Sequence, residues 1–456
     1  MSRWLRRVGR VLLGVAVALT ALAGISGLGV ATTMAQSFPA PPRTEVPPPA
    51  AARPLPPGKL TVAVVIGASG TVASDALVPY EVFARSARFA VYTVAESRTS
   101  AVLSGGVHVL PDHTFAEPLP RPDVVVVPAV AAPAGDREAP LRAWVTAQAE
   151  RGSRILGVCS GAEVLAASGL LDGRRATSHW SRIDSLRRSY PQIGWGVGER
   201  YVEDGPLTTT AGVTSGAAGA LRVLERLAGA EEAGRVGPAV GYPGWTRDGG
   251  HTIPVHRWAL TDLPFGLNAA FPWFRPTIGL AVSDGVGEID LAAAAEVYGG
   301  GSFAARTLSV GESPTMLTRH GLRLMVTPVG ASIPRLDRLV APGGTGTGPV
   351  DPAVTSWAAE RGLAVERPGD GKTGEFGFDP VLRDLARQAD RATARATAAY
   401  LEYPTAHLQL NGPAWPWRPT ALVGAALLTS ALLGLLPTFV GRLLVRRHDT
   451  LPTSSS

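Results

Sequence analysis

The sequence predicts an α/β protein built on a doubly wound parallel sheet, present in tandem copies between an N-terminal and a C-terminal membrane helix. Three observations support this prediction. Short apolar segments alternate with segments of helical spacing through the middle of the chain, which is typical of a parallel sheet with helices on both faces. A segment that starts at Ser74 recurs at Ile289. A long apolar run lies near each end.

The composition bounds the function classes. The chain has 456 residues, of which 45% are hydrophobic, enough for two domains with packed cores. Its net charge is +6, but many of the arginines flank the apolar runs, at positions 3, 6, 7, 10, 442, 446 and 447. This distribution indicates membrane topology rather than a basic groove for nucleic acid. A single cysteine excludes an internal disulfide.

The N-terminal residues 1–36 predict a signal peptide or a membrane anchor. Val11–Val30 is apolar, follows an arginine-rich start and is long enough to span a bilayer, while Thr33-Met34-Ala35 fits a signal-peptidase site. Both alternatives stay open. Residues 37–58 are rich in proline and predict an extended linker.

Residues 419–441 predict a transmembrane helix, and residues 442–456 a cytoplasmic tail. Trp415 and Trp417 precede the apolar run as in an interfacial aromatic belt, and arginines follow it. We therefore expect a protein of the cell membrane whose soluble body is extracytoplasmic and whose C-terminus is cytoplasmic. A buried core helix is the alternative.

Residues 59–230 predict the first domain, which we call the first half. Leu141–Arg151 has the spacing of a helix. Four apolar segments predict buried strands, at Lys59–Gly67, Arg88–Ala95, Asp123–Pro128 and Arg154–Val158. Ligands in such sheets bind beyond the carboxyl ends of the strands.

Residues 276–405, which we call the second half, predict a degenerate second copy, joined by a connecting segment at 231–275. The repeat aligns Asp75 with Asp290 and Glu81 with Glu296. The second half contains no cysteine, and we expect a helix from about Asp379 to Tyr400.

Cys159 lies where an apolar strand ends and a helix begins after small residues, in RILGVCSGAEVLAASGLLDG. This pattern predicts a nucleophile elbow, in which a sharp turn exposes the side chain at the top of the sheet. The helix N-terminus lowers the pKa of such a thiol and offers the backbone N–H groups of Ser160 and Gly161 to an anion. The alternative is an inert, buried cysteine.

The segments SDALVPYEVF, VCSGAEVLAASGLLDGRRATSHW and LTTTAGVTSGAAGALRVLERLAG resemble the ThiJ/PfpI family of the class I glutamine amidotransferase-like superfamily. The similarity covers about residues 60–228 and is closest to isocyanide hydratase-like proteins and the N-terminal domain of AraC-type regulators. It implies a flavodoxin-like fold. It also implies that Cys159 is the nucleophile, that Glu81 hydrogen-bonds the cysteine sulfur and that Asp75 is a catalytic acid.

Each of these assignments has a structural alternative. Glu81 can cap or solvate a helix, and Asp75 can be a helix N-cap. His179, 20 residues after the cysteine, is expected to act as a base or to orient substrate, or else to pack beside Trp180. Asp184 is expected on a solvated helix face.

The sequence departs from the family at two places. Many members have Gly-Gly after the third strand, where this chain has Pro128-Ala129-Val130, so only the N–H of Ala129 is expected to serve an oxyanion. Ser160 follows the cysteine where the family's proteases have histidine, which disfavours a protease.

Two functions follow. The first is a cysteine-dependent hydratase or hydrolase of a small electrophile. The second is a small-molecule or redox sensor without catalysis. We expect no cofactor and no metal, since His251 and His256 read as loop residues. The expected partners are a small molecule and the membrane, without direct nucleic-acid binding, and either a homodimer or an intramolecular pseudo-dimer.

Overall fold

The computed structural model describes residues 2–41, 53–246, 249–343, 348–369 and 374–448, so about half of the predicted proline-rich linker lies outside the described residues. The chain divides into two compact units. The larger unit holds Gln36–Phe265 and Arg275–Trp415, and the smaller holds Met1–Ala35, Gly266–Phe274 and Pro416–Ser456.

The first half forms a seven-stranded sheet that is parallel except for one antiparallel edge pair. All four predicted strands are present. The strand order is β10 (Tyr201–Asp204), β11 (Leu207–Thr210), β7 (Arg154–Gly157), β6 (Val124–Val127), β1 (Leu60–Val65), β2 (Phe89–Ala95) and β5 (His113–Thr114). The central strands are continuous apolar runs because helices bury them on both faces.

Alternate residues of these strands enter two separate cores, one on each face of the sheet. Val62 and Val64 pack with one set of helices, which comprises α2 (Ala73–Ala84), α6 (Ser215–Ala228) and α7 (Ala230–Val240). Ala63 and Val65 pack with the other set, which comprises α3 (Ala139–Glu150), α4 (Gly161–Ala167) and α5 (Trp180–Ser189). This is the doubly wound arrangement that the sequence predicts. A short parallel pair, β8 (Arg175–Ala176) and β9 (Gly194–Trp195), lies outside this sheet.

The second half forms a five-stranded parallel sheet in which the order β13-β12-β17 parallels β2-β1-β6 of the first. Its strands are β16 (Thr327–Pro328), β13 (Arg306–Gly311), β12 (Thr277–Ala281), β17 (Arg338–Val340) and β18 (Val365–Glu366). Its helices are α9 (Glu288–Ala295), α10 (Pro352–Glu360), α11 (Phe378–Gln388) and α12 (Arg391–Tyr400). The prediction of one helix from about 379 to 400 is wrong, because Asp390 caps the N–H of Thr393 and starts a second helix.

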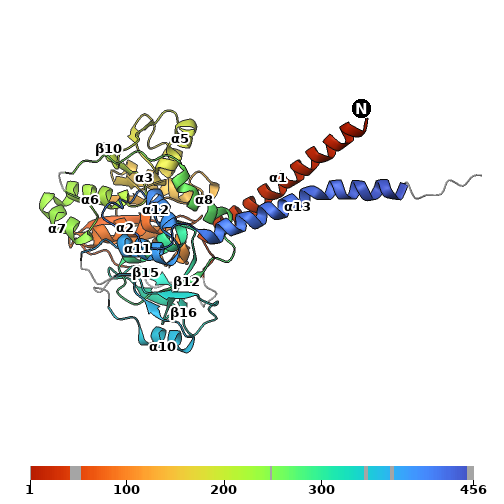
Figure 1. Cartoon of the computed structure of the whole chain (residues 1–456). Coiled ribbons are helices and arrows are strands. Elements are labelled where there is room, and N and C mark those ends of the chain that lie inside the picture. Colours follow the sequence, from red (N-terminus) through yellow and green to blue (C-terminus); the bar gives the residue numbers. More distant parts are fainter. Residues whose placement is uncertain (1, 42–52, 247–248, 344–347, 370–373, 449–456) are drawn as a thin grey trace, which may run out of the picture. The chain divides into compact units, whose positions relative to one another are not determined.

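The two halves contact each other through related elements. Helix α2 packs on α9, and β4 (His108–Val109) pairs antiparallel with β15 (Arg323–Met325). These strands belong to a four-stranded sheet with β3 (Ala101–Val102) and β14 (Thr315–Leu317). Figure 1 shows α2 in the middle of this unit, with α3 and α5 above it and β12 and β16 below.

Gly105 lies in this contact, in the short helical turn Ser104–Gly106. Its φ is +67°, and a Cβ there would lie 2.4 Å from the carbonyl oxygen of Ala295. Gly173 has a similar φ of +70° with open space around a Cβ. We expect Gly173→Ala to lower the free energy of unfolding by about 1 kcal/mol through backbone strain alone. Gly105→Ala should cost about 1–3 kcal/mol more through overpacking. Denaturant unfolding of the full chain in detergent measures both changes in the free energy of unfolding. Equal losses for the two variants would contradict a close contact between Gly105 and Ala295.

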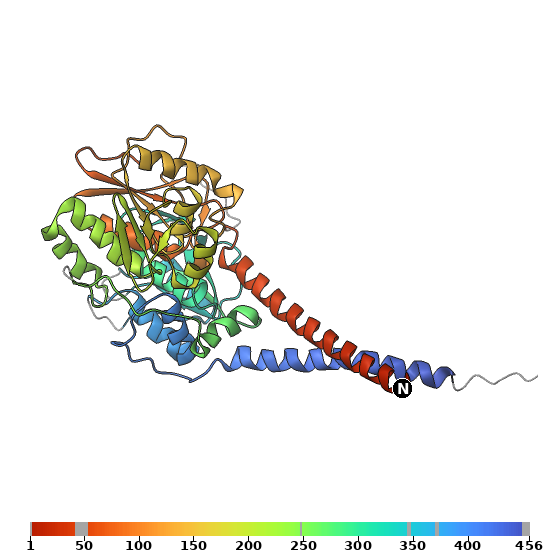
Figure 2. The same cartoon turned by 90° about the horizontal axis from the view of Figure 1, so that it is seen from above.

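The smaller unit contains α1 (Ser2–Ser37) and α13 (Trp417–His448), with α8 (Leu263–Ala270) mostly within it. Helices α1 and α13 cross closely where a Cβ on Gly14 would lie 2.4 Å from the carbonyl oxygen of Gly434, and elsewhere they diverge in Figures 1 and 2. Small residues allow such close helix contacts. Val8–Ser37 and Trp417–Leu436 are long and apolar enough to cross a membrane.

Candidate functional site

Cys159 lies at the carboxyl end of β7, in the sharp turn before α4. Its φ is +58°, in the left-handed region that residues other than glycine rarely adopt. The backbone N–H of Cys159 donates to Thr210 Oγ1 (3.3 Å), and its carbonyl accepts from Ser178 Oγ (3.0 Å). A Cβ on Gly161 would lie 2.0 Å from the Val127 carbonyl oxygen, so the turn requires glycine there. The strand–turn–helix geometry predicted from the sequence is present.

Asp75 places its carboxyl group beside the Cys159 thiol. Asp75 Oδ2 accepts from the N–H of Ala129 at 3.2 Å. Its Oδ1 is buried and has no partner within ordinary hydrogen-bond limits among the described residues. Burial, and then the charge of Glu296, raise the pKa of Asp75 well above its ordinary value.

Cys159 is 6% exposed. Burial, followed by the negative charge of Asp75, raises the pKa of the thiol well above its ordinary value, and the N–H of Ser160 opposes this. This corrects the sequence analysis, which expects the helix N-terminus to lower the pKa. The free-energy cost of desolvating a thiolate exceeds the benefit from one turn of helix.

Glu81 does not bind the cysteine sulfur as expected. It forms an ion pair with Arg85 (2.6 Å) and accepts from the N–H of Ile289 (2.7 Å) at the start of α9. Residues six apart on a helix differ by roughly 120° around its axis, so Asp75 and Glu81 face different neighbours. Glu296, the aligned glutamate of the second half, accepts in the same way from the backbone at the start of α2. Both glutamates therefore join the two halves.

Glu81, Glu288 and His320 carry ligand atoms within 4.8 Å of one another, a donor set that divalent metals accept. Arg85 and Arg319 already lie against Glu81, while Glu288 binds His320 Nδ1 at 2.8 Å. These charges balance without a cation, and we assign the cluster to the contact between the halves.

His179 is held away from a general-base position. It caps α5 through Nδ1, which lies 2.8 Å from Ser181 Oγ, and its Nε2 donates to the Tyr400 carbonyl at 2.7 Å. The ring packs against Trp180, the alternative that the sequence left open. Burial lowers the pKa of His179 to about 4, so the ring is neutral with both nitrogens engaged.

Of the expected oxyanion donors, two are already used. The N–H of Gly161 donates to the Val158 carbonyl (2.8 Å), and the N–H of Ala129 donates to Asp75. The N–H of Ser160 interacts with the sulfur of Cys159. Asp184 is solvent-exposed on its helix, as predicted. His251 and His256 lie in a loop, also as predicted.

A segment of the second half, Tyr400–Tyr403, lies across this site, and we call it the strap. The N–H of Thr214 donates to the Leu401 carbonyl at 3.3 Å. The Glu402 carboxyl group accepts from the N–H groups of Gly212 and Trp180. Burial raises the pKa of Glu402 to about 7. The sequence gives no signal for this residue, because only the fold brings position 402 to position 159.

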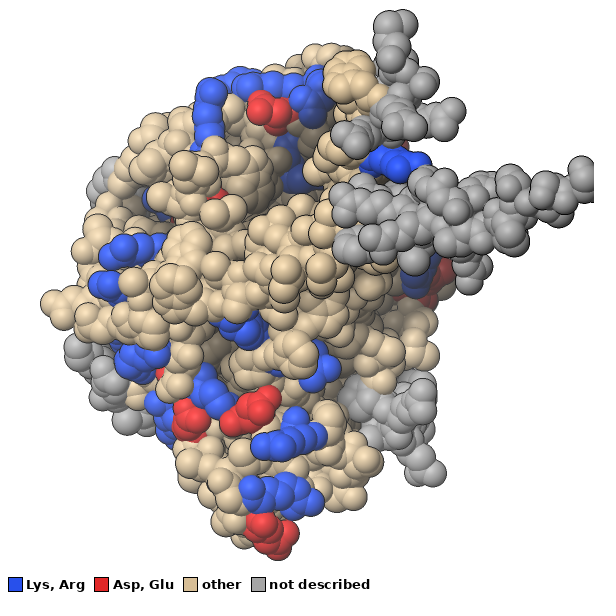
Figure 3. Space-filling view, turned by 45° about the vertical axis from the view of Figure 1, so that its right-hand side comes forward, with Lys and Arg blue, Asp and Glu red and all other residues tan. Residues whose placement is uncertain are grey.

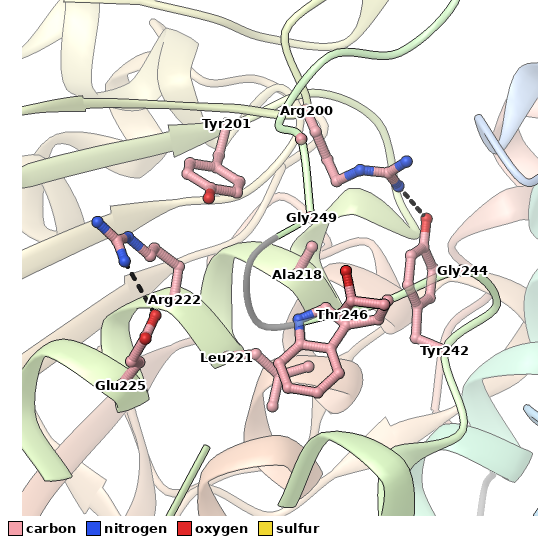
Figure 4. Close-up of a pocket in the computed structure, with 12 residues that line it drawn as sticks. Arg200, Tyr201, Ala218, Leu221, Arg222, Glu225, Tyr242, Gly244, Thr246 and Gly249 are labelled. Carbon is pink, nitrogen blue, oxygen red and sulfur yellow. Dashed lines mark hydrogen bonds and ion pairs between the residues drawn. The ribbon is translucent and has the colours of Figure 1, made fainter. Parts of the chain in front are cut away.

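A separate hollow lies nearby, lined in part by Tyr201, Trp245 and Arg200 (Figure 4). Arg200 donates to the Tyr242 hydroxyl at 2.5 Å, and that hydroxyl lies 3.4 Å from Thr214 Oγ1. Thr214 in turn bonds the strap, so this hollow is linked to the cysteine site by hydrogen bonds.

Comparison with known proteins identifies this architecture. The DJ-1/PfpI family model matches residues 61–226. An isonitrile hydratase of Pseudomonas putida is 36% identical over 158 residues, which are 34% of this chain and 67% of that protein. The chain belongs to the DJ-1/PfpI family. Within the matched DJ-1/PfpI region, Asp75, Cys159 and His179 come from the first half.

Two further relatives of this DJ-1/PfpI chain are informative. The HTH-type transcriptional regulator CdhR of Pseudomonas aeruginosa is 39% identical over 112 residues, 25% of this chain and 33% of that protein. A crystal structure of a ThiJ/PfpI family protein from Pseudomonas syringae is 29% identical, with a TM-score of 0.37, covering 45% of this chain and 89% of that one. The strap and the second half lie outside the matched DJ-1/PfpI region.

Proposed function

We propose that Cys159 and Asp75 form a reactive thiol–carboxyl pair that acts on a small electrophile. The observation that carries this proposal is the strained elbow, which holds the thiol beside a buried carboxyl group. Strained backbone outside glycine is concentrated at functional sites. The Asp75 carboxyl group interacts with the Cys159 side chain, so it is placed to take the thiol proton.

The relation to an isonitrile hydratase supports isonitriles as the first substrate class to test. The sulfur of Cys159 bonds to the terminal carbon, and the thiol proton passes through Asp75 to that carbon. Water then adds to the carbon and the C–S bond breaks. One water proton goes to nitrogen and the other returns to sulfur. Isonitrile plus water thus yields an N-substituted formamide without a redox cofactor.

The acid–base properties of the pair suit this transfer. Because burial raises the pKa of both Cys159 and Asp75, an Asp75 carboxylate is a stronger base here than an exposed aspartate. The thiol therefore transfers its proton within the pair at the moment of attack. Neither Glu81 nor His179 takes part in this scheme.

A sensor is the second candidate, and the strap favours it. The strap is hydrogen-bonded to His179 and Trp180, which ties the surroundings of Cys159 to a fold element outside the family domain. A ligand or an oxidant at Cys159 would move this element. The similarity to a transcriptional regulator supports the same reading.

We further propose that the second half is a degenerate copy that takes the place of a dimer partner. The reciprocal capping by Glu81 and Glu296 and the matching strand order support an intramolecular pseudo-dimer.

We also propose that the C-terminal helix anchors the chain in the membrane and that the body is extracytoplasmic. The flanking arginines and aromatic residues support this proposal. On the face drawn in Figure 3, Lys and Arg residues are scattered and predominate over Asp and Glu.

Turnover of a panel of small isonitriles by the full chain in detergent tests the enzyme proposal. Cys159→Ser should reduce formamide formation on the order of a thousandfold or more, because the nucleophile is lost. Asp184→Asn, at an exposed position, is the control and should leave turnover unchanged. Isonitrile-dependent alkylation of Cys159 without formamide release would favour the sensor. Equal turnover by wild type and Cys159→Ser would refute the proposal.

A further inference from the structure

The strap presents a carboxyl group to backbone N–H groups that surround the cysteine. Gly212 follows β11, and Trp180 is the first residue of α5, so both N–H groups come from loops at the same end of the sheet as Cys159. They donate to Oε2 and Oε1 of Glu402 respectively. The carboxyl group thus lies in a cradle built entirely from the first half.

The cradle is shaped for such a group. A Cβ on Gly212 would lie 2.8 Å from the Glu402 carboxyl carbon, so glycine is needed for the carboxyl group to approach the backbone. The helix N-terminus at Trp180 and the cation of Arg200 favour an ionised carboxyl group, and burial outweighs them, so that the pKa of Glu402 is raised. These are features of a site for an acidic ligand group.

The occupant is held under strain. Glu402 has a φ of +53°, although it is not glycine. Its neighbours are tied down as well, since Tyr400 and Leu401 accept hydrogen bonds from His179 and Thr214. A strained, buried and tethered carboxyl group is one that a free ligand can replace.

We propose that the N–H groups of Gly212 and Trp180 form a subsite for the carboxyl group of a small ligand, and that Glu402 fills this subsite as a tethered occupant. The inference deepens the proposed function and rests on it: the electrophile that reaches Cys159 is a small compound bearing a carboxyl group. The strap must leave before such a compound enters.

Two alkylating agents that differ only in one group test the subsite. Iodoacetate carries a carboxylate, and iodoacetamide carries an amide in its place. We would measure the alkylation rate of Cys159 by both reagents in the full chain, for wild type, Glu402→Ala and Glu402→Gln. Glu402→Gln is the control of matched size: it removes the charge and fills the subsite, and its one carbonyl oxygen can accept from one of the two N–H groups.

We expect the ratio of the iodoacetate rate to the iodoacetamide rate to be about tenfold higher in Glu402→Ala than in Glu402→Gln. In Glu402→Ala the carboxylate of iodoacetate can accept hydrogen bonds from the vacated N–H groups, which the reagent cannot do while glutamine fills the subsite. If the ratio rises equally in both variants, the effect comes only from the loss of negative charge. That result would overturn the proposal. Alkylation of Cys159 that is equally fast in wild type and Glu402→Ala would show that the strap does not cover the thiol.

Acetate supplies a readout that does not depend on the thiol. It should raise the melting temperature of Glu402→Ala by several degrees once it exceeds its dissociation constant, and leave Glu402→Gln and wild type unchanged. A thiol that resists both reagents in every variant would remove the proposed function, while the acetate effect would still establish the subsite. No acetate effect on Glu402→Ala would overturn the subsite itself.

Discussion

Asp75→Asn is expected to abolish isonitrile turnover while making the Cys159 thiol easier to alkylate. The amide cannot carry the proton from sulfur to carbon, and loss of a general acid–base group costs roughly a hundredfold to ten-thousandfold in rate. The same change removes the charge that, after burial, contributes most to raising the pKa of Cys159. The thiolate fraction at a given pH should therefore increase.

The opposite directions of these two effects separate chemistry from folding. Asparagine keeps an oxygen that can accept from the N–H of Ala129, so the local hydrogen bond is retained. Formamide formation and iodoacetamide alkylation would be followed on the same full-length preparations across a pH series, with Asp184→Asn as the control. If both rates fall together, Asp75 only supports the elbow structurally. If both are unchanged, Asp75 has no part in the chemistry.

Stability should depend on pH through Glu402. Its pKa in the folded chain is raised to about 7 by burial, while in the unfolded chain it has an ordinary value near 4.5. Between these values the folded state binds more protons than the unfolded state, so the free energy of unfolding falls as pH rises. The shift corresponds to about 3 kcal/mol, lost between about pH 4.5 and about pH 7.

Glu402→Gln isolates this effect from the other buried acids. The charged and titratable groups that face Glu402 are Arg200, Cys159 and Tyr242, and all three remain in the variant. The difference in free energy of unfolding between Glu402→Gln and wild type should grow by about 3 kcal/mol in favour of the variant from about pH 5 to about pH 8. Glu360→Gln, an exposed control, should parallel wild type. Parallel curves for all three proteins would contradict a buried, titrating Glu402.

Much of the fold could be predicted because its signals are local. The run VVVV at 124–127 is apolar at every position, and the structure buries all four valines in the centre of the sheet. The strand–cysteine–small-residue pattern predicted the elbow, which the φ of Cys159 confirms. The one helix expected near 379–400 was divided by Asp390, whose capping hydrogen bond is not visible in the hydrophobic spacing.

The site was predicted less well, because side-chain partners depend on direction. Asp75 and Glu81 are both acidic and both on α2, and only the helix geometry shows that Asp75 faces the cysteine while Glu81 faces α9. His179 has the expected spacing from Cys159, but its nitrogens bind Ser181 and the strap.

The sequence by itself determined the doubly wound first half, the family and the position of Cys159 on an elbow, because strand patterning and turn chemistry depend on neighbours along the chain. Only the tertiary structure decided that the thiol is buried, that Asp75 is its partner and that the charge of Glu402 acts on it. Burial and long-range contact set the pKa and access of a thiol, and residues 243 positions apart meet only after the chain has folded.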